Sequence, residues 1–248
     1  MPAMKPLPIC FFTQKRTKLA RYVLGSLRDN LSAKGYCPAL ILCHDGSSKE
    51  HVDALSKEAG DWLYRVTDSK GRGLGASMNL GIREALSISD VFLRIEDDWI
   101  LERPLEIGPW VDFMKEDSVG VIRMGMMFRE KDELEPYGPK EMGLLRMRPR
   151  RSRTYNVNNQ VALVHSQVHD LCGMYREGCP AQVSERDFAE RFNSITSNCM
   201  ASPWVCWPEG WSTKVYDARN LYFIHAGKST LGHTQYRVPE RYGWLNEG

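Results

Sequence analysis

Three consecutive acidic residues, Glu96, Asp97 and Asp98, directly follow the apolar segment Val91–Ile95. Adjacent carboxylates at the end of a buried strand repel one another and lose hydration unless a positive charge lies among them. A divalent ion supplies that charge, and Mg²⁺ or Mn²⁺ held by one or two carboxylates plus substrate phosphates is a recurrent arrangement. The alternative is a solvated loop whose acids cap the next segment. The cluster therefore predicts a metal site that neighbouring residues must support.

Further polar clusters follow apolar segments nearer the N-terminus. Thr13–Arg16 (TQKR) begins at the last residue of the apolar segment Pro8–Thr13, and His44–Ser47 (HDGS) directly follows Ala39–Cys43. A glycine-rich turn, Gly71–Gly75, opens an amphipathic segment. In an open α/β sheet, ligands bind outside the carboxyl ends of the strands. We therefore expect these clusters and the acidic one to lie along one edge of a sheet.

A late histidine, His225, lies in the segment Phe223–Ser229 (FIHAGKS) between apolar residues and a glycine turn. Lys228 and Ser229 in that turn could reach phosphate groups. A single histidine in a strand is usually a satisfied core residue, although its imidazole can also ligate a metal. Both interpretations stay open at the level of sequence.

Basic and aromatic residues gather in the second half of the chain. The basic cluster comprises Arg146, Arg148, Arg150, Arg151 and Arg153. Guanidinium forks suit phosphate, so this cluster could grip an anionic acceptor, or it could pair with the acidic stretch 130–135. The aromatic residues are Trp204, Trp207 and Trp211. They could stack on a sugar or an extruded base, with packing in the core or at its edge as the alternative.

Composition indicates an ordinary globular protein. The chain has 248 residues, with 33 Lys+Arg against 31 Asp+Glu for a net charge of +2, and 42% of its residues are hydrophobic. These proportions exclude a fibre, a disulfide scaffold and a disordered chain. No apolar run approaches the ~18 residues of a membrane span, and the N-terminus does not resemble a signal peptide. We therefore expect a cytoplasmic protein without a membrane span, in the host cytoplasm if it is viral.

The seven cysteines form no CxxC pair and no zinc-finger spacing. Their number is odd, so the sequence predicts reduced and mostly buried thiols rather than a disulfide framework. The near-zero net charge argues against general coating of nucleic acid, although charge can still be concentrated locally.

Short apolar runs alternate with amphipathic stretches in the first half, which is typical of β-α-β units and a mainly parallel sheet. The expected strands are Pro8–Thr13, Ala39–Cys43, Trp62–Val66, Val91–Ile95, a strand near Val119–Phe128, and Leu221–Ala226. The expected helices are Lys18–Leu31, a helix capped by Ser47 with Glu50, a helix that ends at Leu86, a helix near Leu105–Met114, and Ser184–Ile195. Nothing marks a linker, so we expect one domain over 1–248. Its 1–100 half would bind a nucleotide sugar, and its 101–248 half would bind an acceptor, with a basic excursion from the sheet over 129–160 and a C-terminal tail.

Four of these motifs together resemble the family-2-like nucleotide-sugar glycosyltransferases of GT-A fold. TQKR is similar to their T-x-N-R, HDGS to their D-D-G-S, Gly73–Gly81 (GLGASMNLG) to their G-x-x-x-A-x-N-x-G helix, and Glu96–Asp98 stands where they keep a D-x-D metal motif. The resemblance covers about the first hundred residues. Lys15, His44 and Glu96 depart from the family pattern, which affects above all the identity of the donor base.

The resemblance implies roles for individual residues. Thr13 and Asp45 would hold the nucleoside, Arg16 or Arg72 would approach the diphosphate, and Asp98 would ligate the metal. Beside these we expect Gly73, Asn79 and Asp97 at the donor and Glu96 and His225 at the metal. From their chemical character rather than from the resemblance, we expect Lys228 and Ser229 at the donor phosphates and Arg148, Arg150, Arg151, Trp204 and Trp207 at the acceptor.

The segment Ser184–Phe188 (SERDF) resembles the E-D-x-D-L segment that carries the family's general base. This resemblance implies that Glu185, with Asp187 beside it, accepts the proton of the acceptor hydroxyl in an inverting transfer. The alternative is structural, because Ser184 with Asp187 is itself a capping box.

The resemblance thus implies a single GT-A-like α/β domain with a mainly parallel sheet flanked by helices. It implies a Mn²⁺- or Mg²⁺-dependent hexosyltransferase that uses a nucleotide sugar, with UDP favoured. The acceptor would be a modified base in DNA, of the kind some viruses glycosylate, or another soluble glycan or protein. The alternatives are a nucleotidyltransferase of related fold, although Thr13–Thr17 lacks the glycines of its phosphate loop, and a non-catalytic module that binds nucleic acid or sugar.

Overall fold

The computed structural model describes residues 4–116, 119–124, 134–141, 144–149, 161–198, 204–208 and 222–226. Its strands are β1 (Lys5–Thr13), β2 (Leu31–Ser32), β3 (Tyr36–His44), β4 (Leu63–Asp68), β5 (Val91–Glu96), β6 (Trp99–Leu101), β7 (Leu105–Glu106), β8 (Val119–Arg123), β9 (Leu134–Glu141), β10 (Leu144–Pro149), β11 (Ala162–His165), β12 (Trp204–Pro208) and β13 (Phe223–His225). Its helices are α1 (Thr17–Asn30), α2 (Lys49–Ala59), the 3₁₀ turn η1 (Gly60–Trp62), α3 (Leu74–Leu86), α4 (Gly108–Glu116), α5 (Gln167–Cys172) and α6 (Ala181–Asn198).

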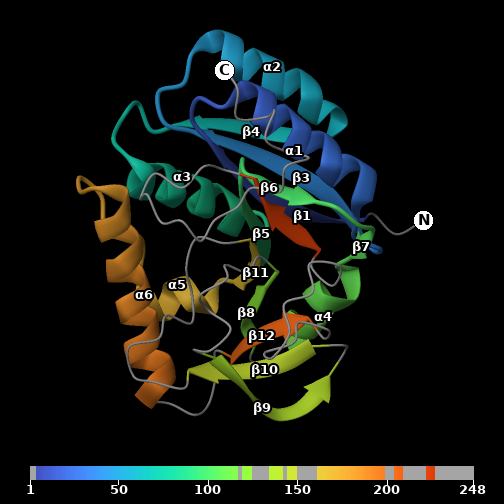
Figure 1. The fold of residues 1–248 in the computed structure, drawn as a ribbon, viewed down its shortest axis with the longest axis vertical. Coiled ribbons are helices and arrows are strands. Elements are labelled where there is room, and N and C mark those ends of the chain that lie inside the picture. The colour runs from blue at the N-terminus through green and yellow to red at the C-terminus, as the bar shows by residue number, and fades with distance from the viewer. Residues whose placement is uncertain are drawn as a thin grey trace.

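A central sheet organises these elements (Figure 1). Within the described residues it has nine strands in the order β4-β3-β1-β5-β11-β8-β12-β10-β9. The four strands from the first hundred residues, β4, β3, β1 and β5, are all parallel, because α1, α2 and α3 form the crossovers between them. The predicted α/β fold with a mainly parallel sheet is confirmed.

The strand order reverses at β1. The chain passes from β1 to β3 and β4 on one side, and then crosses to β5 on the other side of β1. Loops that leave neighbouring strands in opposite directions open a crevice at their carboxyl ends, which is where open α/β sheets bind ligands. The residues after β1 and β5 therefore share this crevice.

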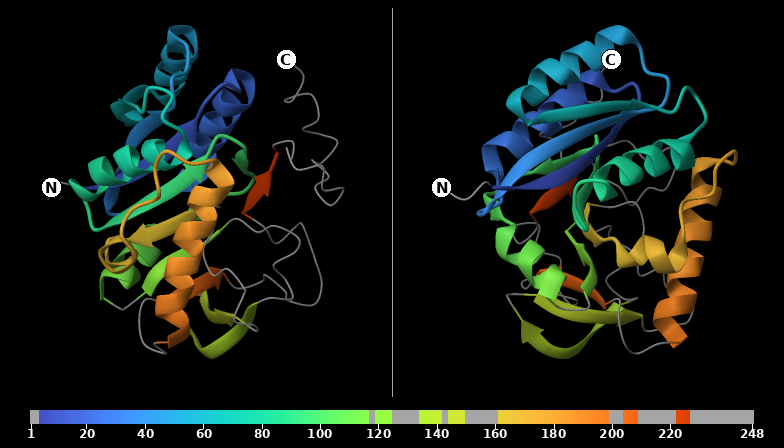
Figure 2. Two further views of the ribbon diagram at one scale, coloured as in Figure 1. Left: turned by 90° about the vertical axis from the view of Figure 1, so that its left-hand side faces the viewer. Right: turned by 180° about the vertical axis from the view of Figure 1, so that it is seen from behind.

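Helices cover both faces of the sheet (Figure 2). The apolar residues of α1, α2 and α4 pack into one core cluster, and those of α3, α5 and α6 pack into another. Strands β1, β3 and β5 contribute to both clusters, since their side chains alternate between the two faces. This two-faced burial explains why their sequences are continuous apolar runs rather than alternating patterns.

The second half differs from its prediction. The excursion predicted over 129–160 contains β9 and β10, which extend the main sheet through the antiparallel pairing of β10 with β12. The predicted helix near Leu105–Met114 is a short strand followed by α4, and the strand predicted to reach Phe128 ends at Arg123. Partners from distant parts of the chain decide these elements, so local periodicity did not reveal them.

Two predicted helix caps are wrong. Ser48 rather than Ser47 precedes α2, and the Ser48 side chain accepts a hydrogen bond from the amide of His51. Helix α6 begins at Ala181, so Ser184 lies inside it, and its hydroxyl donates to the carbonyl of Arg176 at 2.8 Å. Ser184 therefore fixes the loop before α6 instead of capping the helix.

The five cysteines whose side chains the structure describes are free, as the sequence predicts. Cys10, Cys43 and Cys172 are buried, Cys179 is partly buried, and Cys37 is exposed. Among the described helices, none is both long enough and apolar enough to cross a lipid bilayer.

A buried histidine of helix α5 packs against the second core cluster. The ring of His169 stacks on Phe92 at a centroid distance of 6.1 Å and lies 5.4 Å from the ring of Phe188. Its Nδ1 is 3.3 Å from the carbonyl oxygen of Gly173. Burial, the largest cause, lowers the pKa of His169 to about 4. The imidazole is therefore neutral in the folded protein at neutral pH.

We predict that His169→Phe makes the protein less sensitive to acid. Below pH 6.5 the unfolded chain binds a proton at His169 that the folded chain does not bind until about pH 4, so stability falls as the pH drops through this window. Between pH 7 and pH 5 the wild type should lose about 2 kcal/mol more unfolding free energy than the variant. Urea unfolding of both proteins at the two pH values measures this difference, and equal losses would contradict it.

Candidate functional site

The acidic motif forms a buried turn at the end of β5. Asp97 and Asp98 are 2% and 7% exposed, whereas Glu96 is partly buried. The amide of Asp97 donates to the carbonyl of Phe12 at 3.0 Å, which continues the pairing of β5 with β1 beyond the strand itself. The two carboxylates are thereby fixed at the crevice where the strand order reverses.

Arg16 provides the positive charge that these acids need. Its Nη1 donates to Oδ2 of Asp98 at 2.8 Å, and its Nη2 donates to Oδ1 of Asp97. Arg16 comes from the loop between β1 and α1, so the TQKR motif and the acidic motif meet as the sequence predicts. One guanidinium bridges both carboxylates because its fork presents parallel donors.

His225 reaches the same carboxylate from the other end of the chain. Strand β13 pairs with β6 so that His225 lies opposite Trp99, and the amide of Ala226 donates to the carbonyl of Asp98 at 2.7 Å. Nε2 of His225 is 3.3 Å from Oδ2 of Asp98. The predicted association of His225 with the acidic motif is thus present in the structure.

The charges around Asp98 keep it ionised. Burial raises the pKa of Asp98, but His225 and Arg16 outweigh burial and lower it to about 2. For Asp97, burial dominates over Arg16 and raises the pKa to about 6. Burial and the neighbouring Asp98, Glu185 and Asp97 carboxylates raise the pKa of Glu96 further above its usual range. Asp98 is therefore the acid of the motif best able to receive a cation at neutral pH.

The geometry at Asp98 fits a divalent metal. Oδ1 of Asp98 is buried and has no hydrogen-bond partner among the described residues, while the imidazole of His225 faces Oδ2. Carboxylate oxygen and imidazole nitrogen are both ligands that Mn²⁺ accepts, and carboxylate also suits Mg²⁺. No set of three or more His, Cys, Asp or Glu residues within the described ranges could hold an ion. A metal bound here would take its other ligands from water or substrate.

Thr13 lies at the centre of a hydrogen-bond chain behind the motif. Its hydroxyl donates to Oδ2 of Asp97 at 2.7 Å and is 3.0 Å from Nε2 of His51. Because Thr13 gives its proton to Asp97, it accepts one from His51, which leaves Nδ1 of His51 to accept from Thr17 at 2.7 Å. Burial lowers the pKa of His51, in keeping with this neutral tautomer.

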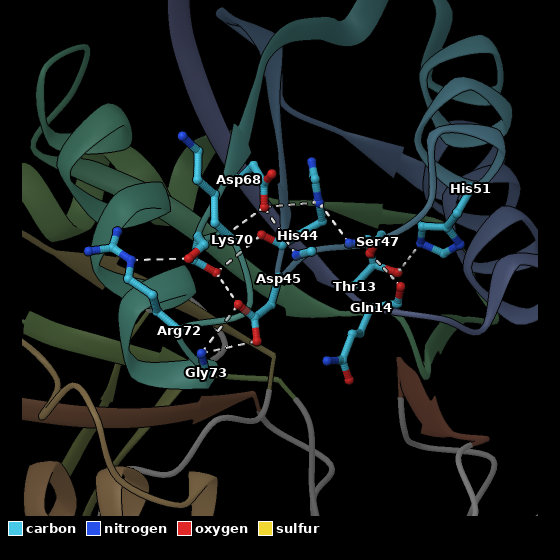
Figure 3. A network of polar contacts seen from close by, with 12 residues as sticks. Thr13, Gln14, His44, Asp45, Ser47, His51, Asp68, Lys70, Arg72 and Gly73 are labelled. Carbon is cyan, nitrogen blue, oxygen red and sulfur yellow. Dashed lines mark hydrogen bonds and ion pairs between the residues drawn. The ribbon is translucent and has the colours of Figure 1, made fainter.

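The HDGS segment closes onto the glycine-rich turn (Figure 3). The carboxylate of Asp45 accepts from the amide of Gly73 at 3.1 Å and from the hydroxyl of Ser69. Gly73 has a φ of +90°, a conformation that favours glycine, and it directly precedes α3. Nε of Arg72 donates to the carbonyl of Ser69 at 3.0 Å. Asp45, Arg72 and Gly73 therefore lie together at one end of the crevice.

Asn79 has a different place from the one predicted for it. It is 2% exposed, and its side-chain nitrogen donates to the carbonyl of Tyr175 at 2.9 Å and to Oε1 of Glu177 at 2.8 Å. Its side-chain oxygen accepts from the amide of Tyr175 at 2.9 Å. Its amide group thus fastens helix α3 to the loop before α6, and its donor role stays a prediction.

The two predicted catalytic acids, Glu185 and Asp187, both lie on α6 but have different neighbours. Glu185 is partly buried, and its charge is close enough to raise the pKa values of Glu96 and Tyr175. Asp187 instead pairs with Arg191 at 2.8 Å, and Arg191 also donates to the backbone carbonyls of Cys172, the last residue of α5, and of Met174 in the loop that follows. Glu185 is therefore close enough to the acidic motif for its charge to act on Glu96, whereas Asp187 is engaged with Arg191, which holds α6 against the end of α5 and the loop after it.

The remaining predicted residues lie apart from these contacts. Arg148 is in β10 and Trp204 and Trp207 are in β12, two neighbouring strands that β11 and β8 separate from β5. Lys228, Ser229, Arg150 and Arg151 lie outside the described residues, so their predicted roles stay predictions.

Sequence analysis missed three residues of the site region. His51 supports Thr13, while Nη1 of the buried Arg94 donates to the hydroxyl of Tyr175 at 2.7 Å beside Glu96 and Glu185. A charged residue inside an otherwise apolar strand was a usable signal for Arg94. His51 and Tyr175 carry no comparable signal, because only the fold brings them near the motif.

Neither a known family profile nor a curated protein matches the sequence. Solved structures do match. S. aureus TarS 1-349 in complex with UDP-GlcNAc has a TM-score of 0.60 at 14% identity, over 98% of this chain and 64% of that one. GalNAc-T7 with UDP, GalNAc and Mn²⁺ has a TM-score of 0.55 at 11% identity, over 84% and 43%.

The mannosyltransferase PcManGT from Pyrobaculum calidifontis, in complex with GDP-Man and Mn²⁺, has a TM-score of 0.54 at 11% identity over 83% of this chain and 57% of that one. This chain thus spans less than two thirds of each of these solved chains. At such identities the likeness concerns the fold. The chain has the GT-A fold, as the sequence motifs predict.

Proposed function

We propose that this protein is a metal-dependent glycosyltransferase that moves a sugar from a nucleoside-diphosphate sugar to an acceptor hydroxyl. The observation that carries the proposal is the buried Asp98 carboxylate, which has one oxygen without a partner and His225 at the other oxygen. This pair lies at the crevice of a GT-A fold, beside Arg16. The solved structures of similar fold include two with Mn²⁺ and a nucleotide or nucleotide sugar, which supports the same chemistry here.

In this proposal Asp98 and His225 hold Mn²⁺ or Mg²⁺. The ion would supply positive charge to the leaving diphosphate, as metals commonly do in such transfers. Asp45 holds the glycine turn in place through Gly73, so that the backbone can approach the nucleotide closely. We favour a UDP-sugar because TarS and GalNAc-T7 are known with UDP-GlcNAc and UDP, while PcManGT with GDP-Man is the reason to test other bases.

Glu185 is the proposed general base of an inverting transfer. An acceptor hydroxyl needs a carboxylate within hydrogen-bond reach that takes its proton as the oxygen attacks the anomeric carbon. Glu185 is close enough to Glu96 and to the buried Tyr175 for its charge to raise the pKa of both groups. Arg94 donates a hydrogen bond to the hydroxyl of Tyr175. Asp187 is committed to Arg191, which leaves Glu185 as the better base of the two.

For the acceptor we propose a hydroxyl-bearing modified base in DNA, with a soluble glycan or protein as the alternative. The support is the basic cluster defined above together with the tryptophans of β12. Part of the basic cluster lies on β10, which pairs directly with β12. Closely spaced guanidinium groups neutralise phosphates, and indole rings stack on exposed bases.

We predict that Asp98→Asn removes metal-dependent donor binding. A thermal-shift panel of UDP-, GDP-, TDP- and CDP-sugars, each with and without Mn²⁺, should show one stabilising donor for the wild type and none for the variant. Loss of a residue that only orients a metal ligand typically costs about 10–100-fold in metal affinity, so loss of the ligand itself should cost at least about 100-fold. Asp53→Asn, which removes an exposed charge paired with Lys49, is the matched control. A donor shift retained in Asp98→Asn would exclude Asp98 from the site.

We predict that Glu185→Gln keeps donor binding and slows transfer by about 10²–10⁴, the usual effect of losing a general base. Single-turnover transfer to acceptor and UDP-sugar affinity are the two measurements. Glu190→Gln on the exposed side of the same helix is the control and should transfer at the wild-type rate. Parallel loss of donor affinity in Glu185→Gln would assign Glu185 to the donor site instead.

We predict that replacing Arg146, Arg148, Arg150, Arg151 and Arg153 together by Ser weakens the binding of duplex DNA more than that of the donor. The slope of log K against log salt is negative, and each lost phosphate contact should reduce its magnitude by about 0.9. Filter binding of an oligonucleotide with hydroxyl-bearing modified bases at several salt concentrations measures this slope. Arg28→Ser with Arg65→Ser, two exposed arginines of the first half, serves as the control. An unchanged slope would favour the glycan or protein acceptor.

A further inference from the structure

Arg16 holds the two buried acids of the motif from the solvent side. The side chain of Arg16 is 43% exposed, whereas the side chains of Asp97 and Asp98 are 3% and 10% exposed. Each carboxylate receives one nitrogen of the guanidinium, so the two contacts are separate and one can break while the other stays.

The two contacts differ in how firmly they are held. Both oxygens of Asp97 are occupied, one by Arg16 and the other by Thr13, which in turn is held by His51. Asp97 therefore has a fixed orientation, with both of its oxygens already engaged.

Asp98 is held in a different way. Its Oδ2 is shared by Arg16 and His225, and its Oδ1 is buried with no hydrogen-bond partner among the described residues. An unpaired buried carboxylate oxygen is costly, so its presence next to an imidazole points to a cation as the missing partner.

Simultaneous binding of a divalent ion and of Arg16 to the Asp98 carboxylate is unfavourable. Two cations on one buried carboxylate repel each other strongly, because the local dielectric constant is lower than that of water. Arg16 can yield because its side chain borders solvent, and Asp97 can retain the other end of the guanidinium.

We propose that Arg16 is a resident counter-cation that competes with the metal for Asp98. In the metal-free protein Arg16 neutralises both acids. When the ion enters, Arg16 leaves Asp98, stays on Asp97, and its released nitrogen binds the diphosphate of the donor. This inference rests on the proposed function, and it assigns regulation to the same site: the ion alone binds weakly, whereas the ion and the nucleotide strengthen each other's binding.

The test is a titration of Mn²⁺ in the absence and presence of UDP, followed by the electron paramagnetic resonance signal of free Mn²⁺. Arg16→Gln should bind Mn²⁺ alone about tenfold or more tightly than the wild type does, because the competing charge is gone. Linked sites typically change each other's affinity by about 5- to 150-fold. In Arg16→Gln the factor by which UDP strengthens the binding of Mn²⁺ should fall by about the same factor of ten or more. Arg21→Gln on helix α1, which removes an exposed cation paired with Glu58 of α2, should behave as the wild type.

The outcomes separate this inference from the proposed function. A wild type that binds Mn²⁺ and UDP, with an Arg16→Gln variant that binds Mn²⁺ alone equally or more weakly, overturns the competition and leaves the proposed function standing. A wild type and variant that both bind neither ligand overturn both. If Arg16→Gln does not fold, Arg16→Lys replaces it: lysine keeps the charge but lacks the planar fork that gives each carboxylate its own nitrogen, so its competition should be weaker and Mn²⁺ alone should bind more tightly than to the wild type. Unchanged affinity in Arg16→Lys would also overturn the competition.

Discussion

The concentration of carboxylates at the end of β5 is the constraint on which the rest of the site depends. Asp97 and Asp98 lie at the crevice beside β1 and are almost fully buried, so their charges need compensation from within a few ångströms. Arg16 supplies positive charge to both, and Nε2 of His225 lies 3.3 Å from Oδ2 of Asp98. Arg16 and His225 stand more than two hundred positions apart in the chain, and the acidic motif is the feature that brings them to one place.

Each partner of the motif is delivered by a different part of the architecture. Arg16 comes from the loop after β1, because β1 is the direct neighbour of β5 in the sheet. His225 comes from β13, which does not join the main sheet but pairs with the short strand β6 that follows the motif. The motif is thus framed by the N-terminal half of the chain on one side and by the C-terminal half on the other.

The opposite wall of the crevice is fixed by close packing of helix α3. A Cβ at Gly75 would lie 2.2 Å from the carbonyl oxygen of Arg176 and 2.7 Å from the hydroxyl of Ser184, so only glycine fits there. Asn79, one turn later, fastens the same helix to the backbone of Tyr175. These contacts set the start of α6 and hence the position of Glu185. The family-like helix motif Gly73–Gly81 therefore acts on the site through packing, because it positions Glu185.

The sequence by itself determined the first half of the fold and the identity of the acidic motif. The runs that became β1, β3 and β5 are continuously apolar because both of their faces are buried, and polar residues mark where each strand ends. Only the tertiary structure decided that Asp97 is a buried anchor while Asp98 has an available oxygen, that Asn79 is structural, and that His51 and Tyr175 belong to the site. The physical reason is that burial and hydrogen-bond partners depend on residues far away in the chain, whereas strand and helix periodicity is written in neighbouring residues.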